Sequence, residues 1–395
     1  MTNNTNFLTK LLDGERVEWK KLGEVIKLEK GKQLNKELLS ESGLYPAYNG
    51  GISHSGFTDT YNYCENTIII SQGGASAGFV NFVNSKFYAN AHCYVVLPKK
   101  EIVKNRYVYH FLKLNQEKLT NNQHGAGIPA LRTSEILELL IPIPCPDNPK
   151  KSLEIKAEIV RILDQLTELT AELTAELTAE LTARKKQYAF YRDQLLTFAE
   201  GEVEWKRLGE VAKYEQPTKY LVETTNYCDD FNIPVLTAGK TFILGYTNET
   251  KGVYEASKNP VIIFDDFTTA NKWVDFDFKA KSTAMKMITS IDESKFILKY
   301  IYYWLNTLPS ELIDGDHKRQ WISNFCNKQI PIPCPDNPKK SLTEQARIVS
   351  ILDKFDALTN SIAEGLPKEI KLRTKQYEYY RSLLLNFPKN EEVVK

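Results

Sequence analysis

The side chains of this chain that could act on a ligand are mostly amides, hydroxyls and cations, the groups that bind nucleic acid. Arginine and amide side chains can pair with base edges, while lysine and hydroxyl groups hold phosphates. The candidates are Lys86, His92, His124 and Arg132 in one stretch, and Lys240, Thr268, Thr269, Asn271, Lys272, His317, Lys318, Arg319 and Gln320 in another. Taken singly, each of these residues is more often an ordinary surface residue. Whether these residues form a binding site therefore depends on the secondary-structure elements that position them.

Three stretches of the sequence resemble known catalytic or nucleotide-binding motifs, but none of them matches completely. Residues 238–241 read Ala-Gly-Lys-Thr like the end of a phosphate-binding loop, but Pro234 stands where the first glycine belongs, so a turn is expected. Residues 71–78 are glycine-rich without the dinucleotide-binding pattern, and a tight loop is expected there. Pro146-Asp147 resembles the start of a nuclease motif, yet its verbatim repeat at Pro335-Asp336 favours a structural role. No spacing pairs a serine or cysteine nucleophile with a histidine, so we predict no catalytic site.

Length and composition set further limits. The chain has 395 residues, 42% of them hydrophobic, which is enough for two cores and a linking element. No apolar run reaches the ~18 residues of a membrane span, and the N-terminus lacks the apolar stretch of a signal peptide. The six cysteines show no C-x-x-C pair and no zinc spacing with the five histidines. We expect a cytoplasmic protein without metal or membrane contact, and a net charge of +1 does not by itself indicate a nucleic-acid binder.

The sequence is an internal duplication. Three segments recur in the same order: 141–153 as 330–342, 184–192 as 373–381, and 17–25 as 203–211. The first of them is identical at every position, which excludes coincidence. Each half therefore consists of a first strand with a tryptophan, a variable domain, a proline-rich exit and a long helix.

The long helix of the first half carries three Thr-Ala-Glu-Leu units in a row, at residues 170–181. Because no Gly or Pro lies between Ala157 and Phe198, one unbroken helix of about 42 residues, roughly 63 Å long, is predicted. Its apolar positions recur in the second half, where Gly365-Leu366-Pro367 predicts a kink or interruption. Two equal apolar seams in one chain favour an antiparallel pair with one domain at each end.

We predict an α+β fold with two globular domains, joined by two long antiparallel helices that form a coiled coil in a pseudo-twofold repeat. Strands are expected at 66–71, 91–97, 259–264 and 283–288, helices at 103–119 and 295–308, and loops at 41–60 and 221–233. The expected boundaries are 1–152 for the first domain, 153–199 for its helix, 200–341 for the second domain, 342–388 for its helix, and 389–395 for a tail.

Several motifs carry a resemblance to a known family. They are 18–24 (Glu-Trp-Lys-Lys-Leu-Gly-Glu), the Pro-Ile-Pro exits, 159–164, 186–188 with 191–192, and the Thr-Ala-Glu-Leu units. Over essentially its whole length the chain resembles the specificity subunit of type I restriction–modification enzymes. Residues 235–245, 264–268 and 319–322 also resemble one class of that family's target recognition domains.

The resemblance implies that each target recognition domain reads one half of a split sequence in double-stranded DNA, and that the paired helices fix the unread gap. It implies two methyltransferase subunits, which carry S-adenosylmethionine, and restriction subunits, which use ATP and Mg²⁺, as partners. The chain itself would be a non-catalytic recognition subunit that binds no cofactor. The resemblance does not supply the target sequence.

Two other classes of function were weighed. A self-sufficient methyltransferase or nuclease would need an Asn-Pro-Pro-Tyr-like tetrapeptide or a set of metal-binding carboxylates, and neither appears. The alternative that the chain is a coiled-coil tether joining two protein-binding domains is not excluded by the sequence. Salt-dependent binding to duplex DNA would separate a recognition subunit from such a tether.

Overall fold

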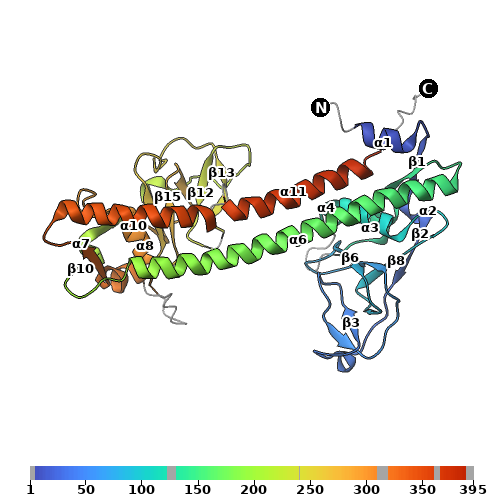
Figure 1. Cartoon of the computed structure of the whole chain (residues 1–395), viewed down its shortest axis with the longest axis horizontal. Coiled ribbons are helices and arrows are strands. Elements are labelled where there is room, and N and C mark those ends of the chain that lie inside the picture. The colour runs from blue at the N-terminus through green and yellow to red at the C-terminus, as the bar shows by residue number, and fades with distance from the viewer. Residues whose placement is uncertain (1–4, 122–129, 240, 309–318, 360–364, 388–395) are drawn as a thin grey trace. The chain divides into compact units, whose positions relative to one another are not determined.

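The computed structural model describes five stretches of the chain: 5–121, 130–239, 241–308, 319–359 and 365–387. The chain forms two compact units (Figure 1). The first unit is Met1–Glu176 with Ile370–Lys395, and the second unit is Leu177–Glu369. Each unit therefore combines one variable domain with parts of both long helical segments.

The first unit is built on a four-stranded antiparallel sheet. Its strand order is β2(Ile26–Lys30)-β8(Cys93–Pro98)-β5(Thr67–Ser71)-β6(Val80–Val83). Every residue of β5 is buried, as its run of isoleucines predicts for a central strand. A second sheet has the order β4(Gly56–Thr58)-β3(Tyr45–Tyr48)-β7(Tyr88–Ala89), and β3 pairs with β7 in parallel. The expectation of loops over 41–60 was therefore wrong, because β3 and β4 lie there.

Short helices complete the first unit. They are α1(Thr5–Leu12), α2(Leu22–Val25), η1(Lys36–Leu38), α3(Asn105–Leu114), α4(Gln116–Asn121) and α5(Thr133–Leu137). The single helix expected over 103–119 is divided at Asn115, whose side-chain amide donates to the carbonyl of Phe111. An asparagine that bonds its own backbone competes with the helical hydrogen bonds and favours a helix end.

The second unit repeats the same strand orders with a different sequence. One sheet is β11(Ala212–Glu215)-β17(Met285–Ser290)-β14(Val261–Asp265)-β15(Asn271–Val274), and the other is β13(Ile243–Thr247)-β12(Ile233–Leu236)-β16(Lys279–Ala280). Its short helices are α7(Leu208–Val211), η2(Pro217–Tyr220), α8(Leu298–Leu305), α9(Gln320–Ser323) and η3(Phe325–Asn327). The strands and helices predicted in both domains are confirmed to within a few residues, apart from the division at Asn115. The duplication thus extends to the topology of the variable domains.

The recurring first strand and proline-rich exit form a two-stranded antiparallel ribbon in each unit. In the first unit β1(Val17–Lys21) pairs with β9(Leu140–Pro144), and Trp19 lies opposite Pro142. In the second unit β10(Val203–Arg207) pairs with β18(Gln329–Pro333), and Trp205 lies opposite Pro331. Proline has no backbone N–H and cannot donate a hydrogen bond to a neighbouring strand. These exits therefore suit a two-stranded ribbon rather than the middle of a sheet.

The first long helix, α6(Pro149–Leu195), is a single element of 47 residues, which confirms the unbroken helix. The second helical segment consists of α10(Pro338–Thr359) and α11(Gly365–Leu385). Gly365 has a φ of +73°, and a Cβ there would lie 2.6 Å from the carbonyl oxygens of Ala357 and Leu358. The predicted interruption is therefore confirmed at Gly365, a position that only glycine fits without strain.

Within each unit the long helices run antiparallel. In the first unit Leu163 of α6 shares a hydrophobic cluster with Leu384 of α11, and further along α6 the Thr167 hydroxyl bonds the Tyr377 hydroxyl at 2.9 Å. In the second unit the Tyr191 ring stacks on Phe355 with centroids 5.5 Å apart. The apolar seams predicted from the sequence thus form contacts in both units.

Candidate nucleic-acid interface

A tight turn between β14 and β15 organises the candidate residues of the second unit. The Asp265 carboxylate accepts hydrogen bonds from the amides of Phe267 and Thr268 at 2.9 and 3.2 Å. Thr269 adopts a positive φ of 62° and donates its amide to the Asp265 carbonyl at 2.9 Å. The turn leaves Thr268 exposed and buries Thr269, which is 6% exposed. Thr269 therefore shapes the turn through its backbone, and Thr268 presents the hydroxyl.

Asp266 fastens the loop of Arg319 and Gln320 to this turn. The Asp266 carbonyl accepts from the Gln320 amide at 2.8 Å, and its carboxylate accepts from the Trp321 amide at 2.9 Å. Lys286, which is fully buried, lies 3.4 Å from the same carboxylate. A buried carboxylate with several donors holds its neighbours in one arrangement. The loop thus begins at a fixed point beside Thr268.

Arg319 is exposed and joins the same polar chain. With the Gln216 amide turned so that its oxygen faces them, that oxygen accepts from Arg319 Nη1 and Lys286 Nζ, each at 3.1 Å. Gln216 thus holds one side of the exposed Arg319 guanidinium, next to the buried Lys286.

A small pocket opens next to the β14–β15 turn. It has a volume of about 340 Å³ and is lined by Ala238, Gly239, Phe242, Ile263, Asp265, Thr268, Ala270 and Lys272. The Lys272 ammonium lies 4.9 Å from the centre of the Phe242 ring. The structure thus brings Thr268 and Lys272 of the β14–β15 hairpin to one site, beside residues between β12 and β13. Of the turn expected at 238–241, Ala238 and Gly239 follow β12 and line this site, and residue 240 lies outside the described residues.

The remaining candidates of the second unit are placed less directly. Asn271 is half-buried, and its Oδ1 is buried without a hydrogen bond from any residue that the structure describes. Lys240, His317 and Lys318 lie outside the described residues.

In the first unit, Gln72 connects two of the predicted candidates. The Gln72 amide donates to the His92 carbonyl at 2.9 Å, and the Gln72 carbonyl accepts from the Leu131 amide at 2.8 Å, next to Arg132. The side chains of His92 and Arg132 are both exposed. A Cβ at Gly50 would lie 2.8 Å from the His92 carbonyl oxygen, so this loop needs glycine. His92 and Arg132 therefore share one edge of the domain.

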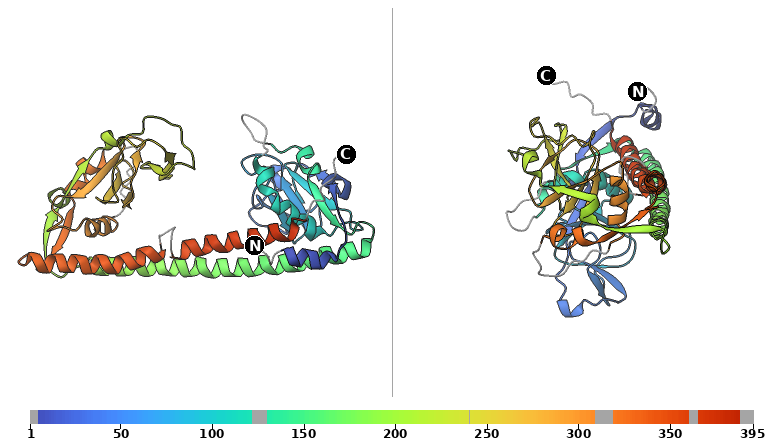
Figure 2. Two further views of the ribbon diagram at one scale, coloured as in Figure 1. Left: turned by 90° about the horizontal axis from the view of Figure 1, so that it is seen from above. Right: turned by 90° about the vertical axis from the view of Figure 1, so that its left-hand side faces the viewer.

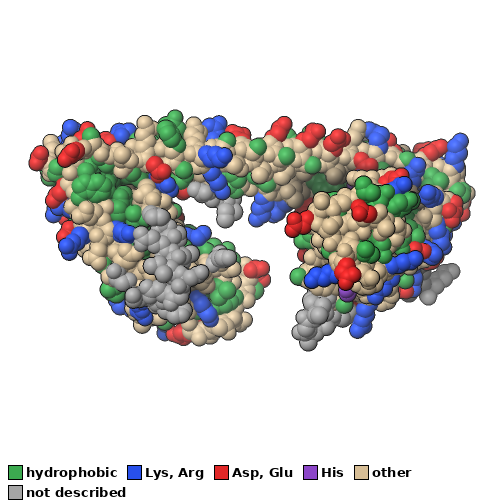
Figure 3. Space-filling view, turned by 90° about the horizontal axis from the view of Figure 1, so that it is seen from below, with side chains coloured by type: hydrophobic (Ala, Val, Ile, Leu, Met, Phe, Trp, Pro, Cys, Tyr) green, Lys and Arg blue, Asp and Glu red, His purple; other side chains and the backbone are tan. Residues whose placement is uncertain are grey.

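Lys86 lies at a different place, on an aromatic pair. Its ammonium is 4.7 Å from the centre of the Tyr61 ring, and Tyr61 packs on Tyr45 with ring centroids 4.9 Å apart. A hydrogen bond with Tyr61 raises the pKa of Lys86, so it stays cationic at neutral pH. No contact of the described residues joins Lys86 to His92, and His124 lies outside them. Figure 3 shows Lys and Arg side chains on the face of the first unit that is turned toward the viewer.

Three residues that contact the candidates were not among the predicted ones: Gln72, Gln216 and Asp266. Each contacts a segment that is remote in sequence, and only Asp266 lies in a motif, 264–268, that the sequence singled out. Gln72 is half-buried, and its Oε1 is buried without a hydrogen bond from the described residues. The only sequence signal was the position of Gln72 at the end of a strongly apolar strand.

Each variable domain is attached to its ribbon by a repeated hydrogen bond. The Tyr107 hydroxyl donates to the Pro142 carbonyl at 2.9 Å, and in the second unit Tyr300 donates to Pro331 at 2.7 Å. These tyrosines lie on α3 and α8, the helices that follow the four-stranded sheets. The two domains therefore sit on their ribbons in the same way, although their sequences differ.

An aspartate of each long helical segment also contacts the variable domain of its unit. Asp164 pairs with Arg106 and lies 2.7 Å from Nε2 of His110, while its repeat counterpart Asp353 accepts from Tyr303 and pairs with Lys299 at 3.0 Å. Burial lowers the pKa of His110 to about 4, and the contact with Asp164 offsets only part of this effect. His110 is therefore neutral at pH 7, and Arg106 supplies the charge that Asp164 requires.

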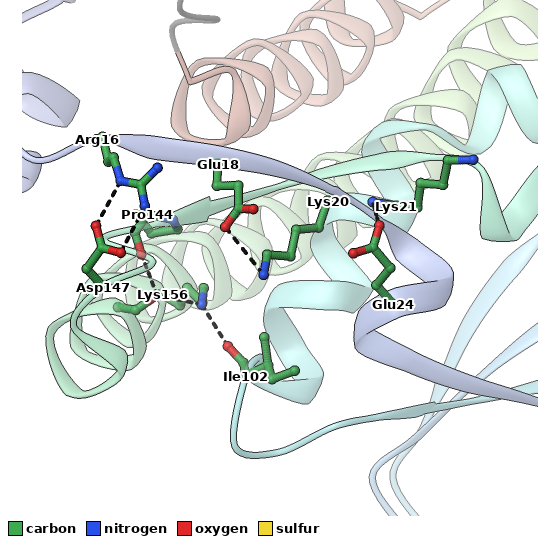
Figure 4. A network of polar contacts seen from close by, with 10 residues as sticks. Arg16, Glu18, Lys20, Lys21, Glu24, Ile102, Pro144, Asp147 and Lys156 are labelled. Carbon is green, nitrogen blue, oxygen red and sulfur yellow. Dashed lines mark hydrogen bonds and ion pairs between the residues drawn. The ribbon is translucent and has the colours of Figure 1, made fainter.

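Figure 4 shows the corresponding contacts at the ribbon of the first unit. The buried Lys156 ammonium donates to the Ile102 carbonyl at 2.7 Å and to the Ser152 hydroxyl at 2.8 Å. Gln345, the repeat counterpart of Lys156, donates to the Lys295 carbonyl at 3.0 Å and to the Ser341 hydroxyl at 3.2 Å. Burial lowers the pKa of Lys156 to about 8. The lysine in one half and the glutamine in the other thus donate to equivalent backbone carbonyls and serine hydroxyls.

Pro146-Asp147 has a structural contact in the first unit. The Asp147 carboxylate accepts two hydrogen bonds from the Arg16 guanidinium at 2.8 and 2.9 Å (Figure 4). The glycine-rich stretch 71–78 is the tight connection between β5 and β6, where a Cβ at Gly78 would lie 2.7 Å from the Leu119 backbone. Both motifs therefore serve the fold.

Neither a metal site nor a membrane helix is found in the described part of the chain. No three His, Cys, Asp or Glu side chains among the described residues are grouped so that they could hold a metal ion. None of the described helices combines the length and the apolar character that crossing a membrane requires.

Comparison with known proteins accounts for the duplicated architecture. The family described as type I restriction modification DNA specificity domain matches residues 15–183 and again residues 200–372. A putative type I restriction enzyme specificity subunit of Haemophilus influenzae is 36% identical over 405 residues, which cover 98% of this chain and 100% of that protein. The type I restriction enzyme EcoR124I/EcoR124II specificity subunit of Escherichia coli is 71% identical over 190 residues, 48% of this chain and 46% of that protein.

Solved structures share the fold. The S subunit of a type I restriction–modification system from M. genitalium matches with a TM-score of 0.53 and 19% identity, over 95% of this chain and 98% of that one. A chain from a solved type I restriction–modification assembly matches with a TM-score of 0.55 and 15% identity, over 93% and 97%. With two copies of the family's domain in one chain and a full-length relative, this chain belongs to the family of type I restriction–modification DNA specificity subunits.

Proposed function

We propose that this specificity subunit reads a bipartite DNA target, one half-site with each target recognition domain, and that the long helices set the unread gap. The observation that carries the proposal is that both domains have the same strand order and the same tyrosine hydrogen bond to their ribbons. Their sequences differ, including at the exposed side chains. Two readers of the same build with different surfaces suit two different half-sites.

The candidate surfaces support a role in reading DNA. In the second domain Thr268, Lys272 and Arg319 lie on hairpin tips and loops that are held by buried carboxylates. In the first domain Gln72, His92 and Arg132 lie at one edge. Arginine and amides discriminate base edges, whereas lysine and hydroxyl groups bind phosphates of any sequence. We assign Arg319 and Gln72 to base reading and Lys272 to phosphate binding.

The chain acts in the cytoplasm without catalysis of its own and as a scaffold for the enzymes of the system. Two methyltransferase subunits supply S-adenosylmethionine, and restriction subunits supply ATP and Mg²⁺. The absence of any nucleophile–histidine spacing in the sequence supports this division of labour. The repeated ribbons and long helices give each of the two methyltransferase subunits a platform.

Binding to duplex DNA at several salt concentrations tests the proposal. The chain with its methyltransferase partner should bind DNA more tightly than the chain alone, and the logarithm of affinity should fall linearly with the logarithm of salt concentration. A coiled-coil tether that joins two protein-binding domains would show no such slope, and that result would refute DNA reading.

A further inference from the structure

The two halves of the chain differ where the ribbon meets the start of the long helix. In the first unit this junction is closed: Cys145 is 1% exposed, Ile155 4% and Phe387 1%. These residues belong to one hydrophobic cluster with Leu8 and Leu12 of α1. Figures 1 and 2 show α1 beside the C-terminal end of α11. The N-terminal helix therefore covers the junction in the first unit.

The corresponding surface of the second unit is open. Cys334, Glu344 and Phe198 stand 189 positions from Cys145, Ile155 and Phe387, and all three are partly exposed. They line a groove of about 680 Å³, which we call the second-half groove, together with Gly201, Glu202, Pro335, Asp336, Asn337, Lys340 and Thr343. Among the described residues of the second unit, none forms a counterpart of α1 over this groove.

The tryptophans of the two ribbons show the same difference. Trp19 is partly buried against the core of the first unit, whereas Trp205 is 54% exposed. Trp205 lies three residues after Glu202, on the strand that leads away from the second-half groove. A large exposed aromatic side chain is typical of protein–protein interfaces, where tryptophan carries much of the binding energy.

Charge also distinguishes the two junctions. In the first unit Arg16 pairs with Asp147 at 2.8 Å, and Glu15 pairs with Lys151 at 3.1 Å. Asp336 and Lys340 repeat Asp147 and Lys151, but the positions of Arg16 and Glu15 hold Glu202 and Gly201.

The second-half groove is therefore acidic at this point. Glu202 and Asp336 are both exposed, and neither forms an ion pair with any residue that the structure describes. Lys340 lines the same groove, but within the described residues it forms no ion pair with Asp336, so the place of Arg16 is open to a cation of a partner.

We propose that the second-half groove is the docking site of a short amphipathic helix supplied by the methyltransferase partner. The leucines of this helix repeat the spacing of Leu8 and Leu12 in α1, and a basic residue beyond its C-terminal end takes the place of Arg16, which follows α1 in the chain. The leucines cover Phe198 and Cys334, and the basic residue pairs with Asp336 and Glu202. Because α1 occupies the equivalent place in the first unit, only one of two identical partner subunits can dock such a helix on this chain.

The inference rests on the proposed function, since it requires a methyltransferase that assembles with the chain. The test is thiol labelling of the full-length chain with N-ethylmaleimide, alone and in complex with the methyltransferase, without DNA, with each cysteine followed by mass spectrometry. Cys334 should react in the chain alone and lose most of its reactivity in the complex. Cys145 is the internal control that stays unreactive in both, and the exposed Cys64 and Cys228 report general access.

The possible results distinguish failure of the docking site from failure of the proposed scaffold function. Failure of the two proteins to assemble, measured by native mass spectrometry, would refute the scaffold function. Assembly with unchanged labelling of Cys334 would overturn the groove alone. Loss of Cys334 labelling in the chain alone at rising concentration would assign the groove to a second copy, and would also overturn the proposal.

A charge variant tests the basic residue of the docked helix. Glu202→Arg recreates the Arg16–Asp147 arrangement within the chain, because the new cation faces Asp336. The variant should bind the methyltransferase about tenfold or more weakly. Glu41→Arg, the same charge change at an exposed position of the first unit, is the matched control. Equal affinities of the two variants, with unchanged melting temperatures, would contradict the proposed charge pairing.

Discussion

Removal of one Thr-Ala-Glu-Leu unit from α6, residues 174–177, should shorten the unread gap of the DNA target by one base pair. α6 is one continuous helix of 47 residues, so a deletion in its middle changes length and rotation together. Leu173, Leu177 and Leu181 are partly buried, while the Ala and Glu residues between them are exposed. The deletion brings Leu181 to the place of Leu177, so the spacing of the partly buried leucines is kept.

The size of the effect follows from helix geometry. Four residues at 1.5 Å each shorten the helix by about 6 Å, and they remove about 40° of rotation beyond one full turn. Duplex DNA advances about 3.4 Å and turns roughly 34–36° per base pair. The rotation corresponds to about one base pair, and the length to nearly two. Orientation is the stricter requirement, because a domain that faces away from its groove reads nothing, whereas bending absorbs a small axial mismatch.

The assay is the mapping of methylated sites in cells that carry the parent chain or the deletion variant with its methyltransferase. Both half-sites should stay unchanged, with a gap one base pair shorter. Glu176→Gln, which alters one unit without altering helix length, is the matched control and should leave the gap unchanged. An unchanged gap in the deletion variant would refute the ruler.

Four further predictions follow from the sites. Arg319→Ala should relax one position of the second half-site at a cost of about 1–3 kcal/mol, measured by competition binding with single-base variants of the target; unchanged methylation in level and sequence would remove Arg319 from the reading surface. Exchange of residues 212–329 for those of a relative should change one half of the methylated sequence and leave the half read by residues 26–140 intact; a change in both halves would contradict independent readers. Lys156→Gln, which copies Gln345, should raise the stability of the first unit by about 1–3 kcal/mol at pH 7, because burial lowers the pKa of Lys156 from 10.5 to about 8 and the folded state bears the cost of the charge. This gain should be complete below pH 8 and vanish as pH rises toward 10.5, as followed by thermal melting; a gain independent of pH would refute the assignment. The purified chain should neither methylate nor cleave DNA, and methyl transfer by a preparation free of any methyltransferase would contradict a non-catalytic subunit.

Repetition made the framework of the fold predictable from one sequence. The ribbon strands around Trp19 and Trp205, the unbroken α6 and the interruption at Gly365 all follow from the two copies and from local patterns. The central strands β5 and β14 were found because continuous runs of β-branched and apolar residues mark buried strands.

Non-local pairing explains most of what was missed. β3 contains Pro46 and pairs in parallel with β7, some forty residues away, so nothing in the stretch 41–60 indicates a strand. The division of the helix at Asn115 depends on one side-chain hydrogen bond. At the candidate site, Thr268 and Arg319 were proposed from residue type, but Asp266, which ties their loops together, acts across 55 residues of sequence. Such contacts belong to tertiary structure and leave no periodic signal.

Single-molecule sequencing of methylated bases, in cells that carry this chain with its methyltransferase, tests the central claim most directly. The account predicts a single motif with two defined half-sites, separated by a fixed gap of unread base pairs. Loss of the chain should abolish methylation at both half-sites together. One continuous motif, or methylation that persists without this chain, would contradict a subunit with two DNA readers held apart by its helices.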